Sequence, residues 1–241
     1  MGQARSTPAY PSPDHLWELL DAKQCAVLEN AGTRHRHPAG TTLLREGDPA
    51  GSALVLLSGR VKVLATGSGG YSSVLAVRVP GDVLGEFAAI DGKPRSATVV
   101  SVDPVCVLRL PAARFNAILS GHPGIAHALL KVIISRLRMA NQRRVEFGET
   151  TVAQRLARTL AELAFEHGEV EAQDIAITLP FGQEDLANMV AGSREAVVRA
   201  LRGLRNQGII STGRKKITIR QPEILGHYAS QPPPEPPTGR S

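Results

Sequence analysis

One segment of the 241-residue chain carries groups suited to holding a polar, anionic ligand. It reads PGDVLGEFAAIDGKPRSATVV, in which Gly85 and Glu86 open a short helical turn and Arg95-Ser96 begins the next strand. The glycine permits close backbone approach, the carboxylate can accept from a sugar hydroxyl, and the guanidinium and hydroxyl can hold a phosphate. The other interpretation is a salt bridge between Glu86 and Arg95 that closes the loop.

A second segment, SREAVVRALRGLRNQG, is suited to reading DNA. Arg194, Glu195 and Arg199 can share one exposed helix edge, where arginine can grip the two acceptors of guanine and glutamate can accept from the cytosine amino group. Between residues 193 and 220, 8 basic residues accompany 1 acid, a balance of +7 against +6 for the whole chain. A solvated helix with paired charges predicts near balance of sign, so the pattern favours DNA.

The sequence around this segment predicts a helix-turn-helix with a wing. A helical pattern in VAQRLARTLAELAFEHG precedes GQEDLANMV and a turn at Ala191-Gly192. Ser193 then stands where an N-cap belongs, and Gly208 stands where a left-handed C-cap belongs. The following IISTGRKKITI alternates around a Thr-Gly pair and predicts a hairpin.

The first segment lies in a strand-rich region between Arg34 and Leu110. Short runs rich in Val, Leu and Thr are bounded there by Gly, Asp, Ser or Pro, which predicts an antiparallel roll or barrel beginning at TTLLREGD. A short amphipathic helix from Leu16 to Gly32 precedes the roll. The chain's nine aromatic residues are too few for a stacking platform that binds single-stranded nucleic acid.

A long helix predicted from Pro123 to Phe147 separates the two regions. Apolar residues step by four and three along it, with one polar interruption, as in a heptad seam that packs against a partner helix. The seam consists of Ala126, Leu130, Ile133, Leu137, Ala140, Arg144 and Phe147. The alternative is a helix lying along its own roll, since Val132, Ile134 and Met139 are apolar off the seam.

These patterns predict an α+β chain with a defined order of domains. The expected parts are a flexible tail over 1–15, a ligand-binding β-roll over 16–122, a dimerisation helix and hinge over 123–150, a winged helix-turn-helix over 151–222 and a Pro-rich tail over 223–241.

Composition excludes several classes of protein. Charged residues make up 21% of the chain and hydrophobic residues 42%, which excludes general disorder, and no apolar run approaches the length of a membrane span, so we expect a soluble, cytoplasmic protein. Two cysteines cannot build a disulfide framework, a Cys-rich zinc site or a four-thiolate cluster. His35 and His37 are expected in a loop before the first strand, where exposure is commoner than metal binding, so no metal is expected. No phosphate loop, zinc-protease motif or nucleophile elbow is present, so we expect no enzyme.

Taken together and in order, these motifs resemble the cAMP receptor protein and FNR superfamily of bacterial transcription factors. The resemblance runs through EGDPAGSALVLLSGRVKV, the segment around Glu86, the seam helix and SREAVVRALRGLRNQGII, from about Leu16 to Ile219. It implies a homodimer with a cyclic-nucleotide-binding β-roll, a long dimer helix and a winged helix-turn-helix. The resemblance does not extend to the branches that sense oxygen through four cysteines or gas through haem, so we expect neither an iron–sulfur cluster nor haem.

The resemblance also implies the nucleotide contacts. Gly85 and Glu86 match the family's ribose-contacting pair, and Arg95 and Ser96 match the pair that clamps the cyclic phosphate. Backbone at Phe87 and Ala88 would line the pocket. Ala140 and Asn141 match the Thr-Ser pair that reaches adenine from the dimer helix; Ala140 has no hydroxyl, whereas Asn141 can still hydrogen-bond across the dimer.

On the DNA side, Arg194, Glu195 and Arg199 match the three base-reading positions of members that recognise TGTGA half-sites, and Ser193 matches a phosphate contact. The resemblance therefore implies a regulator whose affinity for near-palindromic duplex DNA is controlled by a cyclic nucleotide, with cAMP favoured and RNA polymerase as a further partner. The alternatives are a regulator that binds DNA without ligand or answers another nucleotide, and a module that docks on a partner protein.

Overall fold

The computed structural model describes residues 15–66, 72–178, 182–213 and 216–230. It divides into two compact units, one ending at Met139 and the other running from Ala140 onward. The expected tail over 1–15 lies outside the described residues except for His15, and so do residues 231–241 of the Pro-rich tail. The side chain of Phe147, at the end of the seam, is likewise outside the described part.

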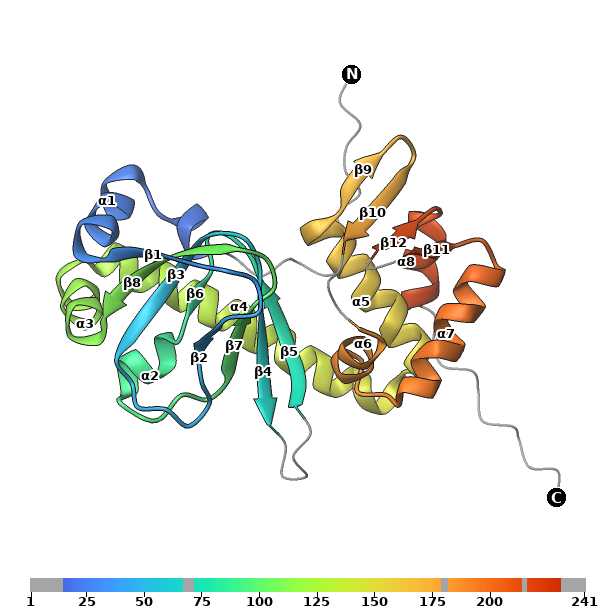
Figure 1. The fold of residues 1–241 in the computed structure, drawn as a ribbon, viewed down its shortest axis with the longest axis horizontal. Coiled ribbons are helices and arrows are strands. Elements are labelled where there is room, and N and C mark those ends of the chain that lie inside the picture. Colours follow the sequence, from blue (N-terminus) through green and yellow to red (C-terminus); the bar gives the residue numbers. More distant parts are fainter. Residues whose placement is uncertain (1–14, 67–71, 179–181, 214–215, 231–241) are drawn as a thin grey trace. The chain divides into compact units, whose positions relative to one another are not determined.

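The first unit is a roll of two four-stranded antiparallel sheets (Figure 1). One sheet has the order β1-β8-β3-β6 and the other the order β2-β7-β4-β5. Their bounds are β1 Thr33–His37, β2 Thr42–Leu44, β3 Ser52–Ser58, β4 Val61–Thr66, β5 Ser72–Arg78, β6 Val83–Leu84, β7 Thr98–Ser101 and β8 Val105–Pro111. Alternation along each strand sends one set of side chains into the roll and the other outward.

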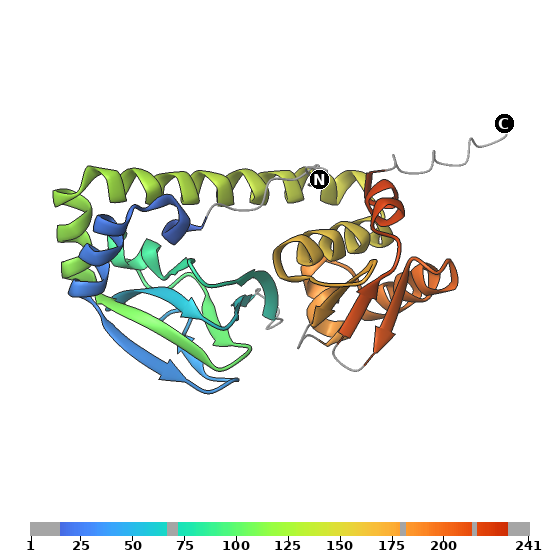
Figure 2. The same ribbon diagram turned by 90° about the horizontal axis from the view of Figure 1, so that it is seen from above.

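Five helical elements belong to the roll or begin at it. They are the 3-10 helix η1 (Leu16–Leu19), then α1 (Ala22–Ala31), α2 (Glu86–Asp91), α3 (Ala112–Gly121) and the long α4 (Pro123–Glu149). Figure 2 shows α4 as one uninterrupted helix.

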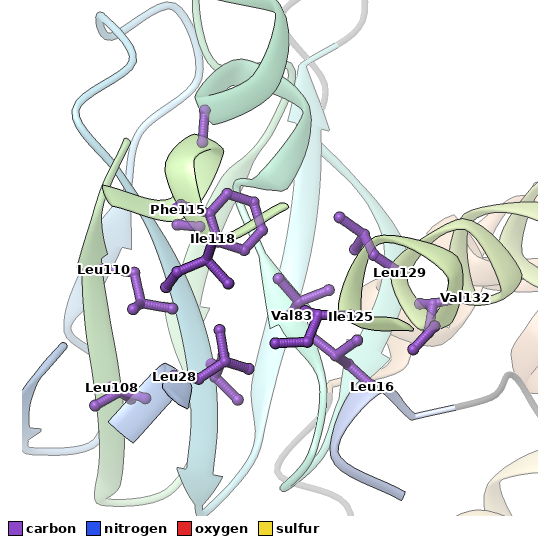
Figure 3. Packing of buried hydrophobic residues seen from close by; sticks show 14 residues of the cluster. Leu16, Leu28, Val83, Leu108, Leu110, Phe115, Ile118, Ile125, Leu129 and Val132 are labelled. Carbon is purple, nitrogen blue, oxygen red and sulfur yellow. The ribbon is translucent and has the colours of Figure 1, made fainter. Parts of the chain in front are cut away.

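Two apolar clusters hold the roll together. Leu54, Leu56 and Val107 belong to the cluster between the sheets. A larger cluster lies between the sheet that contains β3 and β8 and the helices, and Figure 3 shows Ile125 of α4 beside Val83 in it. Each large side chain fully buried in this way contributes about 1.5–3 kcal/mol to folding.

The structure corrects two expectations at the start of the roll. The helix predicted from Leu16 to Gly32 is broken, because Asp21 caps α1: its side chain accepts from Gln24 N and its own N–H donates to the Gln24 side chain. His15, assigned to the flexible tail, is only 14% exposed in its side chain and lies 3.4 Å from Asp82.

A third correction concerns His35 and His37, which lie in strand β1 and not in a loop before the roll. β1 pairs with β8 along its whole length, placing the two histidines opposite Val107 and Val105. Because side chains alternate along a strand, both rings lie on one face, with centroids 6.4 Å apart.

Helix α4 has two apolar faces. Ile125, Leu129 and Val132 are buried against the roll, so the helix does lie along its own roll over part of its surface. On the predicted seam, Leu130 and Leu137 are 52% and 58% exposed. One chain therefore leaves an apolar stripe of α4 uncovered.

The second unit is a helix-turn-helix with a wing, as the sequence predicts. Its sheet has the order β11-β12-β10-β9, in which the β11–β12 hairpin forms the wing. The elements are α5 Val152–His167, β9 Glu169–Glu171, β10 Asp174–Thr178, α6 Gln183–Met189, α7 Arg194–Asn206, β11 Ile210–Gly213, β12 Lys216–Ile219 and α8 Pro222–Ser230. The strand pair β9–β10 was not expected from the sequence.

Helix α8 corrects the expected start of the Pro-rich tail at residue 223. Leu225 and Ala229 are 1% and 5% exposed, and Arg158 of α5 donates to the Ala229 carbonyl at 2.8 Å. Leu225 and Ala229 are four residues apart, which is the spacing of one helix face. The Pro-rich composition of the residues that follow led the sequence analysis to assign both of them to the tail. Residues 222–230 are therefore part of the folded unit.

Membrane insertion of a single helix is not supported in the described part of the chain, where no helix is both long and apolar enough to cross a bilayer. The pair Ala112–Gly121 and Pro123–Gln142, bent by 109°, meets that test only when its two helices are taken together.

Replacing Leu225 with alanine tests the packing of α8. We expect a loss of about 2–5 kcal/mol in the free energy of unfolding, because the side chain is fully buried. Ile224→Ala is the matched control: this neighbour is 50% exposed and its truncation should cost less than half as much. Equal losses in urea denaturation of the two variants would show that α8 does not pack as described.

Candidate functional site

The predicted ligand residues in the roll begin at Gly85, which caps the N-terminus of α2. Its φ of 70° lies in the left-handed region that favours glycine. A Cβ at this position would lie 2.4 Å from Nη1 of Arg95 and 2.8 Å from Leu44. Both the backbone conformation and the close approach of the guanidinium therefore require glycine here.

Arg95 was expected to begin the next strand, but it lies in the loop before β7, which starts at Thr98. From this loop its side chain reaches back to the cap at Gly85. It is 6% exposed, and its guanidinium donates to the carbonyls of Gly85 at 2.7 Å and Ser52 at 2.6 Å. Burial and the neighbouring Arg109 lower the pKa of Arg95 from its ordinary value. The guanidinium is thus held by neutral backbone acceptors and not by a contacting carboxylate.

Glu86 pairs with Arg136 of α4 and not with Arg95. The distance from Nη1 of Arg136 to Oε1 of Glu86 is 2.8 Å, and the loop-closing salt bridge is replaced by this contact to α4. Arg136 also donates to Asp82 at 2.8 Å and to the Val83 carbonyl at 3.1 Å. Arg136 and Asp82 were not among the predicted site residues. Arg136 lies directly before the seam residue Leu137, but the neighbouring Arg138 gives the sequence no means of singling it out.

Asp82 is the most buried member of this ion cluster, with 1% of its side chain exposed. Burial opposes its ionisation, but a hydrogen bond from His15 and the positive charges of Arg78 and Arg136 outweigh burial and lower the pKa of Asp82. Breaking a buried ion pair by removing one partner leaves an uncompensated charge. The cluster therefore fixes the loop before β6 and the start of α2 to α4.

The remaining predicted ligand residues are more dispersed. Phe87 is 48% exposed, Ala88 is buried and Ser96 is exposed. Ala140 and Asn141 are exposed on α4, and Ala140 lies one helical turn beyond Arg136 on the same face. The structure thus brings Gly85 and Arg95 together, and it links Glu86 to the helix that carries the last two residues.

The predicted DNA-reading residues lie at the N-terminal end of α7. Ser193 is the N-cap, its Oγ accepting from the N–H of Ala196 at 3.2 Å, and Arg194, Glu195 and Arg199 are all exposed. The preceding turn places Ala191, and not Gly192, at a positive φ of 45°. The expected left-handed glycine at the end of α7 is present: the C-cap is Gln207, and Gly208 directly after it has a φ of 69°.

Glu195 is held ionised at this helix end. Its own backbone N–H, a hydrogen bond from Ser193 and the charges of Arg194 and Arg199 lower the pKa of Glu195 below its ordinary value. An ionised carboxylate only accepts hydrogen bonds, which suits a donor such as the cytosine amino group.

Some of the other basic residues around α7 already contact neighbouring side chains, and others are exposed. Arg205 donates to Thr212 at 3.1 Å, and Lys216 forms an ion pair with Glu171 at 2.9 Å, while Arg202 and Arg220 are exposed. Two further basic residues of the predicted cluster, Arg214 and Lys215, lie outside the described residues. No group of three or more His, Cys, Asp or Glu that could hold a metal ion occurs in the described part of the chain.

Comparisons with known proteins match both units. The model of the cyclic nucleotide-binding domain matches residues 34–122, and that of the Crp-like helix-turn-helix domain matches residues 154–228. A CRP-like cAMP-activated global transcriptional regulator of Mycobacterium tuberculosis is 29% identical over 192 residues, covering 80% of this chain and 86% of that protein. The cyclic AMP receptor protein of Thermus thermophilus is 27% identical over 196 residues, covering 81% and 88%.

Among solved structures, the c-di-GMP responsive global regulator CLP of Xanthomonas campestris superposes with a TM-score of 0.73. It is 23% identical, and the match covers 83% of this chain and 99% of that one. At this identity the likeness concerns the fold. The α+β architecture predicted from the sequence, a roll followed by a long helix and a helix-turn-helix, is confirmed.

Replacing Asp82 with asparagine tests the ion cluster. The folded pKa of Asp82 lies below its ordinary value of 3.8, so its ionised form stabilises the fold above that pH and the contribution is lost as the pH falls through the folded pKa. We expect Asp82→Asn to lose about 3 kcal/mol of unfolding free energy at neutral pH. The difference from the native chain should narrow in acid below pH 3.8. Urea denaturation at both pH values measures this, and a pH-independent difference would contradict it.

Proposed function

Because the chain belongs to the cAMP receptor protein and FNR superfamily of bacterial transcription regulators, we propose that it is a homodimer whose affinity for specific DNA is controlled by a cyclic nucleotide, with cAMP as the favoured ligand. The family consists of transcription regulators with a helix-turn-helix, and not of enzymes. Three points are proposed: the cyclic nucleotide that is bound, the homodimeric state and the DNA half-sites that are recognised.

The observation that carries the proposal is the exposed edge at the start of α7. Arg194, Glu195 and Arg199 are all exposed in the first two turns of this helix, which Ser193 caps. An arginine can take both acceptors of a guanine, and the ionised glutamate can accept from cytosine, so TGTGA-type half-sites suit this set. Exposed Arg202 and Arg220 are available for phosphates, which position the protein without reading sequence.

The uncovered stripe on α4 supports dimerisation. Leu130 and Leu137 recur at the seven-residue spacing of a helix pair, and both are more than half exposed in one chain. Two copies packed along this stripe would bury it. A two-fold dimer would present two copies of α7 to half-sites about 34 Å apart in successive major grooves.

Ligand control is proposed to act through Glu86 and Arg136. Oε1 of Glu86 accepts from Arg136, and a carboxylate has further acceptor positions that a ribose hydroxyl can use. Arg95 and Ser96 would hold the cyclic phosphate beside it. A ligand at these groups would contact Glu86, the residue that joins α2 to α4. It would shift the protein between arrangements of low and high DNA affinity only as far as its own affinity for those two arrangements differs.

The change would pass along α4 to the helix-turn-helix. Helix α4 ends at Glu149, and α5 begins after the N-cap Thr151, which forms a capping box with Gln154. The proposed hinge runs from Gly148 to Thr151 and spans this junction. The ends of two well-formed helices meet there, so a small rotation at the junction is the proposed means of transmission.

Fluorescence anisotropy of a labelled duplex with inverted TGTGA half-sites tests the whole proposal. At fixed salt, saturating cAMP should tighten binding by about 5–150-fold, the usual range of allosteric coupling. A scrambled duplex of equal length and composition is the control for sequence reading. Equal affinity with and without cAMP would refute cAMP control in favour of a ligand-independent regulator or one with another ligand, and equal affinity for both duplexes would refute sequence reading.

Arg194→Ala separates base reading from charge. We expect a loss of about 1–3 kcal/mol on the specific duplex and relaxed preference at one base pair. Arg202→Ala, which removes the same charge from the same helix, should instead weaken binding to specific and random duplexes alike and reduce the salt dependence of binding. If Arg194→Ala weakened binding to random DNA as much as to the specific duplex, the base-reading assignment would be wrong.

A further inference from the structure

A cavity lies in the roll, and Glu86 is not part of its lining. Its volume is about 460 Å³, and residues of β1, β2, β3 and β8 line it (these strands are labelled in Figure 1). Of the predicted nucleotide residues only Arg95 borders it; Gly85, Glu86 and Ser96 do not. Cavities of this size hold small-molecule ligands.

The cavity is lined by an excess of positive charge. The charged and imidazole groups in its described lining are Arg45, Arg95, Arg109, His35, His37 and one carboxylate, Asp48. Arg95 makes its two hydrogen bonds to neutral carbonyls, and the nearby Arg109 lowers the pKa of Arg95. Two guanidinium groups therefore lie close enough to repel each other, with a single acid in the lining.

The donors of this cavity are largely unused. Arg109 donates through Nε to Oγ of Ser52 at 3.3 Å, and no other hydrogen bond of its side chain occurs among the described residues. The exposed side chain of Arg45 forms no hydrogen bond or ion pair with another residue in the described part of the chain. The stacked imidazoles of His35 and His37 add further N–H groups on the β1 side. Nε2 of His35 lies 3.0 Å from Oγ1 of Thr33.

The strand pairing explains why these groups converge. In β1, the alternation of side chains puts His35 and His37 on the same face as Val107 and Val105 of β8. Two residues further along β8, Arg109 lies on that face again, opposite Leu54 of β3. The edge strand that the sequence analysis placed in a loop thus supplies one wall of the cavity.

We propose that this cavity is a separate anion site that binds a pyrophosphate group, with Arg109 and Arg45 as its principal charged donors. A guanidinium matches phosphate oxygens with two parallel hydrogen bonds, and the diphosphate charge would relieve the repulsion between Arg95 and Arg109. Arg95 would stand between this site and the Glu86 pocket. The proposal does not depend on cAMP being the ligand of that pocket.

Isothermal titration calorimetry of the full chain with inorganic pyrophosphate tests the site. We expect saturable binding that Arg109→Leu and Arg45→Leu each weaken at least about tenfold, as loss of a charged hydrogen bond implies. Arg36→Leu is the matched control, because Arg36 lies between the two histidines on β1, is exposed and does not line the cavity. It should change the affinity less than about twofold, within the range of surface charges.

Three results would overturn the proposal. The first is absence of saturable pyrophosphate binding, and the second is equal weakening by Arg109→Leu and Arg36→Leu, which would indicate general charge attraction. The third is competition between pyrophosphate and cAMP with Arg109→Leu weakening both equally, which would reveal a single site. Thermal melting of each variant checks that the roll is folded. Arg45 and Arg109 are both exposed, and Arg45→Leu provides the second variant if Arg109→Leu unfolds.

Discussion

The contact of Arg136 with two buried carboxylates is the constraint on which the roll depends. One guanidinium from α4 serves Asp82 and Glu86, whose side chains are 1% and 7% exposed. Without that guanidinium, two buried carboxylates would lie on neighbouring turns of the chain with no compensating charge from α4. Since they flank β6 and open α2, the ion cluster fixes the orientation of the whole candidate ligand segment against α4. Apolar packing of Ile125 and Val132 holds the same helix against the roll.

In the second unit, the main feature is the charged N-terminal end of α7. Val197, Leu201 and Leu204 bury one face of α7, so its arginines are left on the outside. Helix α8, the last element of this unit, packs on α5, the helix that follows α4. Ser193 both caps the helix and donates to Glu195, so the same hydroxyl group that ends the turn also helps to keep the reading carboxylate charged.

Much of this organisation can be predicted from the sequence, because periodicity and capping residues act locally. The helix-turn-helix follows from the apolar spacing around Val197 and from the caps Ser193 and Gly208. Strand β1 could not be predicted, since TRHRH carries no apolar residue and becomes a strand only by pairing with β8. Glu86 and Arg136 lie fifty residues apart, so their pairing depends on how α4 packs. Composition concealed α8, whose buried Leu225 and Ala229 precede a run of prolines.

The two backbone bonds of Arg95 have a bearing on the concentration of ligand to which the roll could respond. Its guanidinium satisfies the carbonyls of Gly85 and Ser52, both at hydrogen-bonding distances under 3 Å. The Gly85 carbonyl also accepts from the N–H of Ala89, so it keeps a partner without Arg95. An anion that drew the guanidinium away from the Ser52 carbonyl would break a buried hydrogen bond and leave its acceptor unpaired, at a cost of about 1–3 kcal/mol. Each 1.4 kcal/mol raises a dissociation constant about tenfold. The resting arrangement of one arginine would therefore set a threshold, so that an anion present only at trace levels leaves the roll unoccupied.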